Sequence, residues 1–153
     1  MWTWKISQGE LLNAAGNHID FGYSGRGWCV NNPDCCNVKG LEDWVPPVGV
    51  HMDIPGIQFI PNAGPIPVGK YTIGAPVDSH GGYALPLSPW PDNEMHGRRS
   101  FLIHGGFKSD PPPSAGNGNA SLGCIIVARP PRVGIWESGD HTIRVVRGDE
   151  NES

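Results

Sequence analysis

The apolar residues of this chain fall into short patterned runs, and glycine, proline and asparagine separate them. The 153 residues include 22 glycines and 16 prolines, about twice the usual share of these two residue types. This composition approaches that of disordered chains, but six tryptophans and the patterned runs indicate a packed core. We therefore predict a single, mainly β domain of sandwich or barrel-like type, with one or two short helices and long loops. It covers residues 1–147 and is followed by a polar tail at 148–153.

Period-two alternation locates the first strands. Residues 2–6 and 19–23 alternate between apolar and polar side chains, and turn-forming residues at 13–17 lie between them, which predicts an opening β-hairpin. Pro86 has no N–H to donate, so it assigns the strand around it to a sheet edge. Residues 132–138 are expected to form a short helix, with prolines before it and a glycine after it. The other expected strands are 58–60, 70–73, 83–87, 101–103 and 142–146.

Charge and hydropathy exclude two classes of partner. The net charge is −4 and no run of Lys or Arg exists, so the chain has no electrostatic footprint for nucleic acid. No apolar stretch is long enough to predict a membrane span. The N-terminal residues lack a basic patch followed by an apolar stretch, so we expect no secretory signal peptide and synthesis in the cytoplasm.

A histidine and a cysteine are the best candidates for chemistry. His104 ends the buried apolar run at 101–103 and opens into a long loop at 105–120. Loops of this length in compact domains are usually functional or disordered. Cys124 directly follows Gly123, which leaves its sulfur accessible and an unhindered backbone N–H beside it.

Nucleophilic thiol chemistry needs a thiolate, a base that forms it, and N–H donors for the developing oxyanion. We expect Cys124 to be the nucleophile and His104 its base. The amides of Gly123 and Cys124 are natural oxyanion donors, and the carbonyl of Gly105 is an acceptor that can orient the imidazole. Ser121 is expected to shape this turn or to act directly in catalysis; the alternative is an ordinary backbone hydrogen bond in the turn.

This pattern resembles the L,D-transpeptidase family, whose members remodel bacterial peptidoglycan. In that family a histidine is followed by a loop and then by Ser/Thr-x-Gly-Cys; here residues 105–120 separate His104 from Ser121-Leu122-Gly123-Cys124. Residues 64–71 resemble the Pro-x-Gly-x-aromatic turn that precedes the catalytic half of those enzymes. Four segments resemble a narrower branch of toxins that are delivered by the type VI secretion system, namely 22–25, 31–33, 97–101 and 123–126.

The resemblance implies an L,D-transpeptidase or L,D-carboxypeptidase that needs no cofactor and no metal. Cys124 would attack the meso-diaminopimelate carbonyl of a tetrapeptide stem, release D-Ala and form an acyl-enzyme. Water, a free D-amino acid or a second stem would then accept the acyl group. The resemblance also implies action in the periplasm of a target bacterium, with a cognate immunity protein and a component of the secretion apparatus as partners.

One position departs from the family pattern. Many relatives carry Arg or Asn two residues after the cysteine, and this chain has Ile126. We therefore expect the missing substrate contact from Arg98 or Arg129. Tyr23 is a further candidate for the substrate groove, although aromatic residues of β domains are usually part of the core.

Three cysteines lie outside this motif, at 29, 35 and 36. Their spacing is not typical of zinc sites, so a metal site is the weaker alternative. A disulfide between Cys29 and either Cys35 or Cys36 suits an oxidising compartment and leaves one thiol over.

Less specific interpretations stay open at this point. Cys124 can be an inert buried thiol, since free cysteines are often buried. The histidines at 51, 80 and 96 are expected to be surface or loop residues. Two other functions compete with a wall-modifying enzyme: a non-catalytic module that binds the cell wall, and a general cysteine peptidase that acts on proteins.

Overall fold

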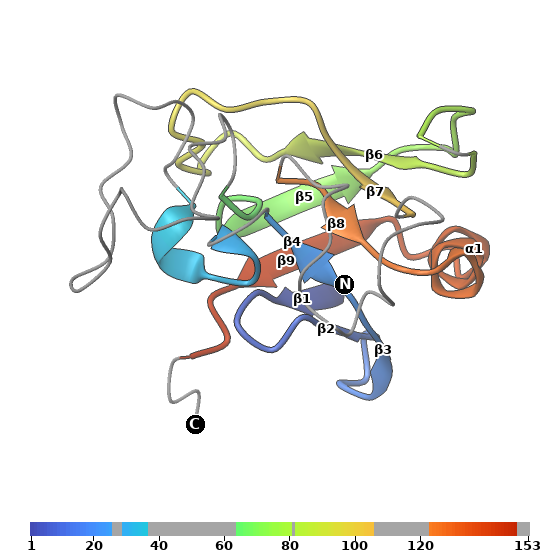
Figure 1. Cartoon of the computed structure of the whole chain (residues 1–153). Coiled ribbons are helices and arrows are strands. Elements are labelled where there is room, and N and C mark those ends of the chain that lie inside the picture. Colours follow the sequence, from blue (N-terminus) through green and yellow to red (C-terminus); the bar gives the residue numbers. More distant parts are fainter. Residues whose placement is uncertain (26–28, 37–63, 81, 106–122, 150–153) are drawn as a thin grey trace, which may run out of the picture.

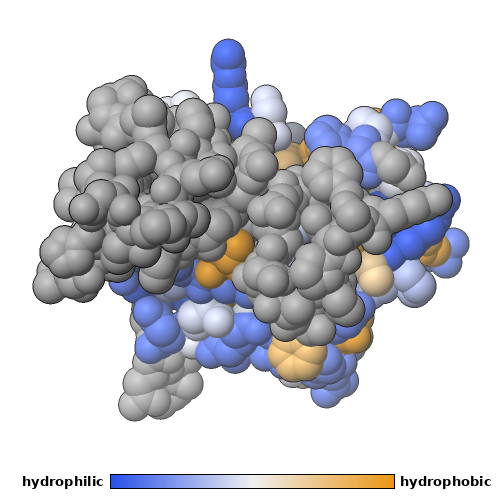
Figure 2. Space-filling model, in the orientation of Figure 1, coloured by the Kyte–Doolittle hydropathy of each residue, from blue (hydrophilic) through white to orange (hydrophobic). Residues whose placement is uncertain are grey.

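A computed structural model describes residues 1–25, 29–36, 64–80, 82–105 and 123–149 (Figure 1). These residues form a nine-stranded sheet that curls into a nearly closed barrel, together with one α-helix and loops. The predicted mainly β class is therefore confirmed. No helix among the described residues is long and apolar enough to cross a membrane. On the face seen in Figure 2, hydrophilic residues cover most of the described surface.

The elements are short, as the turn-rich sequence predicts. The strands are β1 (Trp2–Lys5), β2 (Glu10–Leu12), β3 (His18–Phe21), β4 (Tyr23–Ser24), β5 (Gly69–Ile73), β6 (Leu85–Pro89), β7 (Phe101–His104), β8 (Ile125–Ile126) and β9 (Thr142–Val146). The helices are the 3-10 helix η2 (Pro33–Cys35) and α1 (Arg129–Glu137). The strand order is β3-β2-β1-β9-β5-β6-β7-β8-β4. The pairs β1–β9 and β7–β8 are parallel, and the other pairs are antiparallel.

The two edge strands of this sheet, β3 and β4, are consecutive in the chain, and Gly22 alone separates them. The Gly22 amide donates to the Gly9 carbonyl at 2.7 Å. A Cβ added to Gly22 would lie 2.1 Å from the Ile126 carbonyl oxygen on β8. Only glycine allows this approach, so Gly22 lets the chain pass from one edge of the sheet to the other and close the barrel.

The barrel encloses an apolar core to which nearly every strand contributes. In α1 the buried residues are Arg132 and Ile135, and Ile135 joins the same core. The largest fully buried side chains of this core are those of Trp4, Ile6, Leu11, Ile66, Tyr71, Ile73, Leu85, Ile103, Ile125 and Ile135. Burial of a Leu- or Ile-sized side chain contributes about 1.5–3 kcal/mol, so this cluster is the main source of stability.

The predicted opening hairpin is placed differently in the structure. The turn at 13–17 joins β2 to the edge strand β3, and β1 pairs with the other side of β2, toward the interior of the sheet. β1 is buried because β9 flanks it on its other side. Ile19 and Phe21 are 38% and 45% exposed because β3 is an edge strand. The strand predicted at 58–60 lies outside the described residues.

The assignment of Pro86 to a sheet edge is wrong, since β6 lies between β5 and β7. Register places Pro86 opposite Gly74, the residue after the end of β5, and the Gly74 amide donates to the Pro86 carbonyl at 2.7 Å. Proline therefore lacks only the reciprocal bond to Gly74, at the very end of the β5–β6 ladder, where the loss disturbs the sheet least. The helix also starts earlier than predicted, at Arg129, because its prolines occupy the first turn, where N–H groups have no partner in the helix.

Replacing Gly22 by alanine tests the closure of the barrel. The new Cβ would meet the Ile126 carbonyl at 2.1 Å and the Val127 side chain at 2.7 Å, so β4 must move from β8. We expect the free energy of unfolding, measured by urea titration, to fall by about 1–3 kcal/mol. Gly134→Ala is the matched control: it adds a Cβ in α1 with nothing within 4 Å. It should raise stability by about 0.5–1 kcal/mol. Equal stability of Gly22→Ala and the wild type would contradict this account.

Candidate active site

The parallel pair β7–β8 brings the two motif residues together. His104 is in register with Ile126, and Cys124 directly precedes β8. Side chains alternate between the two faces of a sheet, so His104, Leu102, Cys124 and Ile126 share one face. With a strand spacing of ~4.8 Å and a rise of ~3.3 Å per residue, the Cα atoms of His104 and Cys124 lie on a diagonal of about 8 Å. Side chains at such positions can reach one another.

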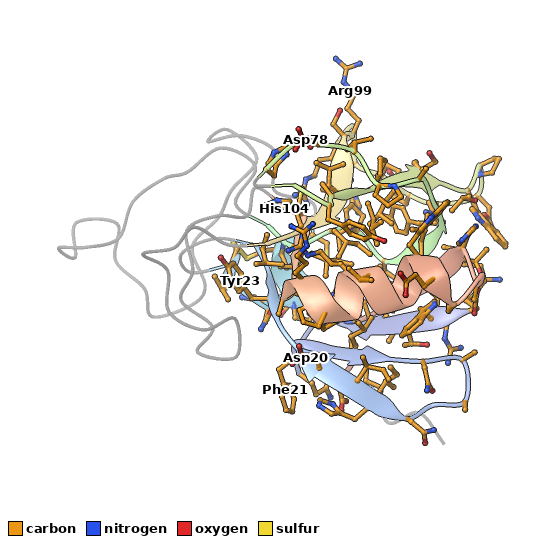
Figure 3. The ribbon with its side chains drawn as sticks, turned by 90° about the vertical axis from the view of Figure 1, so that its right-hand side faces the viewer. Asp20, Phe21, Tyr23, Asp78, Arg99 and His104 are labelled. Atoms are coloured by element: carbon orange, nitrogen blue, oxygen red, sulfur yellow. A yellow bond between two sulfur atoms is a disulfide. The ribbon has the colours of Figure 1, made fainter. Side chains whose placement is uncertain are left out.

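β4 extends this face by one more strand. Tyr23 pairs with Ile126, so Tyr23, Ile126 and His104 form a row across β4, β8 and β7. Tyr23, Cys124 and Ile126 make a small buried cluster that is separate from the main core. Tyr23 is only 1% exposed, so it packs within the site and not in an open groove. Figure 3 shows Tyr23 and His104 on the same side of the ribbon.

The hydrogen bond of His104 determines which ring nitrogen can act as a base. Nδ1 lies 2.7 Å from the carbonyl oxygen of Gly105, which can only accept, so Nδ1 carries the proton and Nε2 is the acceptor. Burial lowers the pKa of His104 to about 4, the Gly105 contact opposes this shift, and the charges of His80 and Arg132 add to it. The imidazole is thus neutral at physiological pH, which is the form that a general base requires.

His80 is a neighbour of His104 that the sequence gave no reason to select. It lies in an exposed loop, as expected, but its ring centroid is 4.5 Å from that of His104, with an interplanar angle of 33°. Its φ of 51° belongs to the sparsely populated left-handed region, and its Nδ1 lies 3.1 Å from the Ser79 hydroxyl. Packing on one face of His104 restricts the rotation of the imidazole.

Arg132 fixes the backbone around this histidine pair from α1. Its side chain is buried, and its Nη1 donates to the carbonyls of Gly82 and Tyr83 at 2.9 and 2.8 Å. A Cβ added to Gly105 would lie 2.9 Å from Arg132 Nη2, so the guanidinium packs against the residue that orients His104. Arg132 therefore connects α1 to residues 82–83 by hydrogen bonds and to Gly105 by packing.

Cys124 is 8% exposed, and its sulfur accepts a hydrogen bond from the Leu102 amide at 3.4 Å. Burial raises the pKa of Cys124, whereas the Leu102 amide, the charge of Arg98 and its own amide lower it. These three groups favour the thiolate. Burial would also fit an inert thiol, and a backbone amide and the charge of Arg98 also lower the pKa of Cys36. The position of His104 on the same face as Cys124 distinguishes this site.

Gly123 is held by a buried hydroxyl that sequence reasoning missed. Ser24 Oγ donates to the Gly123 carbonyl at 2.9 Å and accepts from the Ile66 amide at 2.9 Å, and Ser24 is fully buried. Gly123 has a φ of 113°, which favours glycine. The one sequence signal for Ser24 is its place in a segment that resembles the toxin branch.

The remaining predicted site residues are distributed differently. Arg129 is exposed at the start of α1, with its guanidinium 5.5 Å from the centroid of the Tyr83 ring. Arg98 is buried and donates to backbone carbonyls, so its contacts are within the protein. Ser121 lies outside the described residues.

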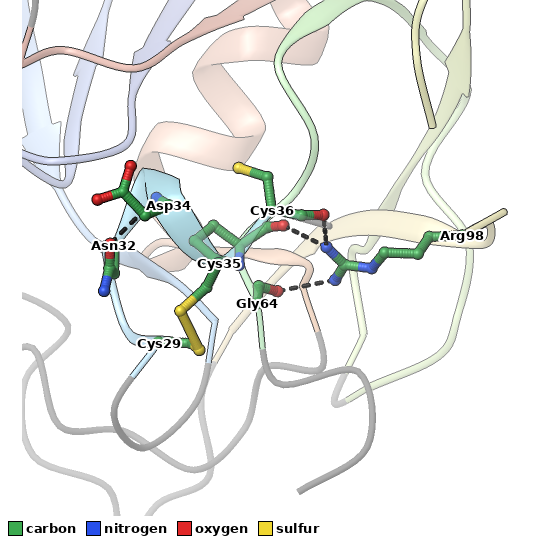
Figure 4. The surroundings of a disulfide bond; sticks show 8 residues. Cys29, Asn32, Asp34, Cys35, Cys36, Gly64 and Arg98 are labelled. Atoms are coloured by element: carbon green, nitrogen blue, oxygen red, sulfur yellow. Dashed lines mark hydrogen bonds between the residues drawn. A yellow bond between two sulfur atoms is a disulfide. The ribbon is translucent and has the colours of Figure 1, made fainter. Parts of the chain in front are cut away.

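The cysteine-rich segment contains a disulfide between Cys29 and Cys35 (Figure 4). Cys36 is left as a free thiol that is 8% exposed, with its sulfur 3.6 Å from the Ile66 carbonyl. Burial raises the pKa of Cys36 to about 11, although Arg98, Arg147 and the Val68 amide act in the opposite direction. Cys36 is therefore a protonated thiol at any physiological pH.

Comparison of the chain with models of known families, with curated proteins and with solved structures finds no match.

Replacing both Cys29 and Cys35 by serine tests the contribution of the disulfide to stability. For a loop closed over a sequence separation of 6, loop entropy predicts a loss of about 2 kcal/mol in the free energy of unfolding. Urea titration of the double variant and of the wild type, each with and without dithiothreitol, measures this loss. The reductant should destabilise the wild type and leave the double variant unchanged. A wild type that is insensitive to reduction would contradict the expected contribution.

NMR titration of the histidine ring protons tests the environment of His104. We expect its midpoint at about 4, far below the usual 6.5. The unfolded chain protonates this group before the folded protein does, so stability should fall as the pH drops from about 6.5 to about 4. His80→Phe keeps the ring packing but removes a charge, so it should raise the His104 midpoint. His96→Phe is the control and should not. A His104 midpoint near 6.5 in the wild type would refute the buried, neutral base.

Proposed function

We propose that this chain is a cysteine enzyme that modifies the tetrapeptide stem of peptidoglycan, as an L,D-transpeptidase or L,D-carboxypeptidase. One observation carries the proposal: β7 and β8 place a neutral imidazole and a sulfur with a backbone N–H donor on the same face of adjacent strands. The Ser121–Cys124 motif and its spacing from His104 supply the substrate class through the family resemblance.

The attack step uses both residues in their neutral forms. His104 Nε2 takes the thiol proton of Cys124 while Sγ bonds to the carbonyl carbon of the diaminopimelate residue. The amides of Gly123 and Cys124 donate to the oxyanion that forms. Gly105 keeps the proton on Nδ1 and so keeps Nε2 available, as the orienting residue of a catalytic triad does.

Collapse of this intermediate breaks the bond to D-Ala, whose amine takes the proton from the His104 imidazolium. A thioester on Cys124 remains. Water then releases a tripeptide stem, a D-amino acid gives exchange, and the amine of a second stem gives a crosslink; His104 removes the proton of each acceptor. Arg129, exposed beside the Tyr83 ring, is the candidate contact for a substrate carboxylate.

The biological setting follows from the narrower resemblance and is part of the same proposal. The chain acts as an antibacterial effector of the type VI secretion system in the periplasm of a target cell. Its partners are peptidoglycan stems, D-amino acids, a cognate immunity protein and a component of the secretion apparatus. The disulfide between Cys29 and Cys35 is compatible with an oxidising compartment.

Mass spectrometry of a disaccharide tetrapeptide, incubated with and without D-methionine, tests the enzyme. The wild type should release D-Ala or exchange it for D-methionine. Cys124→Ala should abolish both reactions, and His104→Ala should slow them at least about 100-fold. Cys36→Ala and His96→Ala are matched controls, since each removes the same chemical group elsewhere in the chain, and both should stay active.

The same variants separate the two competing functions. Folded wild-type protein with a reduced Cys124 that leaves every wall fragment unchanged would refute the enzyme. Wall affinity and toxicity that survive in Cys124→Ala would then identify a binding module. Cleavage of casein that depends on Cys124, without action on muropeptides, would identify a general cysteine peptidase.

A further inference from the structure

Arg98 is a buried cation that joins segments distant in the sequence. It lies in the loop before β7 and is only 6% exposed. Its Nη1 donates to the carbonyls of Cys36 at 2.6 Å and Pro65 at 2.7 Å. Its Nη2 donates to the carbonyl of Gly64 at 2.7 Å (Figure 4). The planar fork of the guanidinium is therefore fixed by the disulfide segment on one side and by the turn before β5 on the other.

The same guanidinium packs directly against the residue that precedes the nucleophile. A Cβ added to Gly123 would lie 2.3 Å from Arg98 Nη2 and 2.6 Å from the Phe101 ring. The guanidinium lies 5.1 Å from the centroid of that ring, so Arg98, Phe101 and Gly123 form one contact. Gly123 is thus held between this contact and the hydroxyl of Ser24, which donates to its carbonyl.

Arg98 also influences the charge of the sulfur. The guanidinium carries a positive charge, and the carbonyls of Cys36, Pro65 and Gly64 that accept from it are neutral. That charge lowers the pKa of Cys124, against the larger effect of burial. The pKa of Arg98 responds in turn. Burial lowers it, whereas negative charge on the nearby side chains of Cys36, Tyr71 and Cys124 would raise it. Arginine stays protonated in proteins even so.

We propose that Arg98 is a positioning residue for the nucleophile: its guanidinium fixes the backbone of Gly123, and its charge favours the thiolate of Cys124. This role replaces the substrate contact that the sequence led us to expect. As a statement about acyl transfer it rests on the proposed function, whereas its effect on the reactivity of the thiol does not. Lysine can supply the charge but cannot bond to three carbonyls through a planar fork.

The test measures thiol reactivity apart from turnover. In a Cys36→Ser background, in which Cys124 is the single free thiol, the rate of alkylation by iodoacetamide is followed against pH for Arg98→Met, Arg98→Lys and Arg99→Met. Arg99 is the matched control because it is exposed and, in Figure 3, points away from the ribbon. Near-UV circular dichroism verifies the fold, and muropeptide assays give kcat and KM.

Arg98→Met should raise the midpoint of alkylation by about one pH unit or more, because a nearby opposite charge is lost. Arg98→Lys should leave the midpoint near that of the wild type but lower kcat at least about tenfold, with little change in KM, because the backbone is misplaced. Arg99→Met should match the wild type in both.

Two results would overturn the proposal: a folded Arg98→Met with the alkylation midpoint of Arg99→Met, or an Arg98→Lys with unchanged kcat. If Arg98→Met does not fold, the lysine variant alone decides. A wild type that turns over no muropeptide refutes the proposed function, and the alkylation profiles of Arg98→Met and Arg99→Met still decide whether Arg98 acts on Cys124.

Discussion

The chain can form its site only because it passes from one edge of the sheet to the other at Gly22. That passage sets β4 against β8, so Tyr23 and Ser24 reach the residues around Cys124 although they are distant in the sequence. Ser24 then holds the carbonyl of Gly123. Without the close approach of Gly22 to the Ile126 carbonyl, β8 would be an edge strand, and the backbone before the cysteine would lose its buried support.

Buried polar side chains, and not regular secondary structure, hold the irregular backbone of the site. Arg98, Arg132 and Ser24 are each nearly inaccessible to solvent, and each bonds to backbone groups of loops or strand ends. A buried carbonyl or amide without a partner costs about 1–3 kcal/mol, so each of these side chains satisfies groups that a loop-rich chain would otherwise leave unpaired. A domain that is rich in glycine and proline needs such contacts because its strands are short.

Sequence patterns predicted the strands with regular alternation or continuous apolar runs, such as β1 and β7, because burial on one or both faces leaves a local signal. They missed β2 and β8 and joined β3 with the first residue of β4 as one strand at 19–23, since two or three residues carry no clear period. The candidate nucleophile and base, Cys124 and His104, could be selected from the sequence because their spacing is local to one motif, and their roles stay predictions. The role of Arg98 was not, because its carbonyl partners come from segments that meet only in the fold. The packing of His80 on His104 likewise depends on a left-handed turn that no local pattern specifies.

The two free thiols, Cys36 and Cys124, are equally buried but lie in different surroundings. Cys36 and Cys124 are equally exposed, at 8%, and burial raises the pKa of both. Backbone amides and the charge of Arg98 lower the pKa of both thiols, and the sulfur of Cys36 in addition lies 3.6 Å from the Ile66 carbonyl, to which its thiol can donate. Cys124 also shares a face with an imidazole that is neutral at physiological pH. A neutral pair at rest develops charge only as the proton moves, so the nearby Arg98 charge and the Leu102 amide stabilise the thiolate when it forms. In this arrangement the barrier to thiolate formation depends on groups that are already in place before a substrate binds.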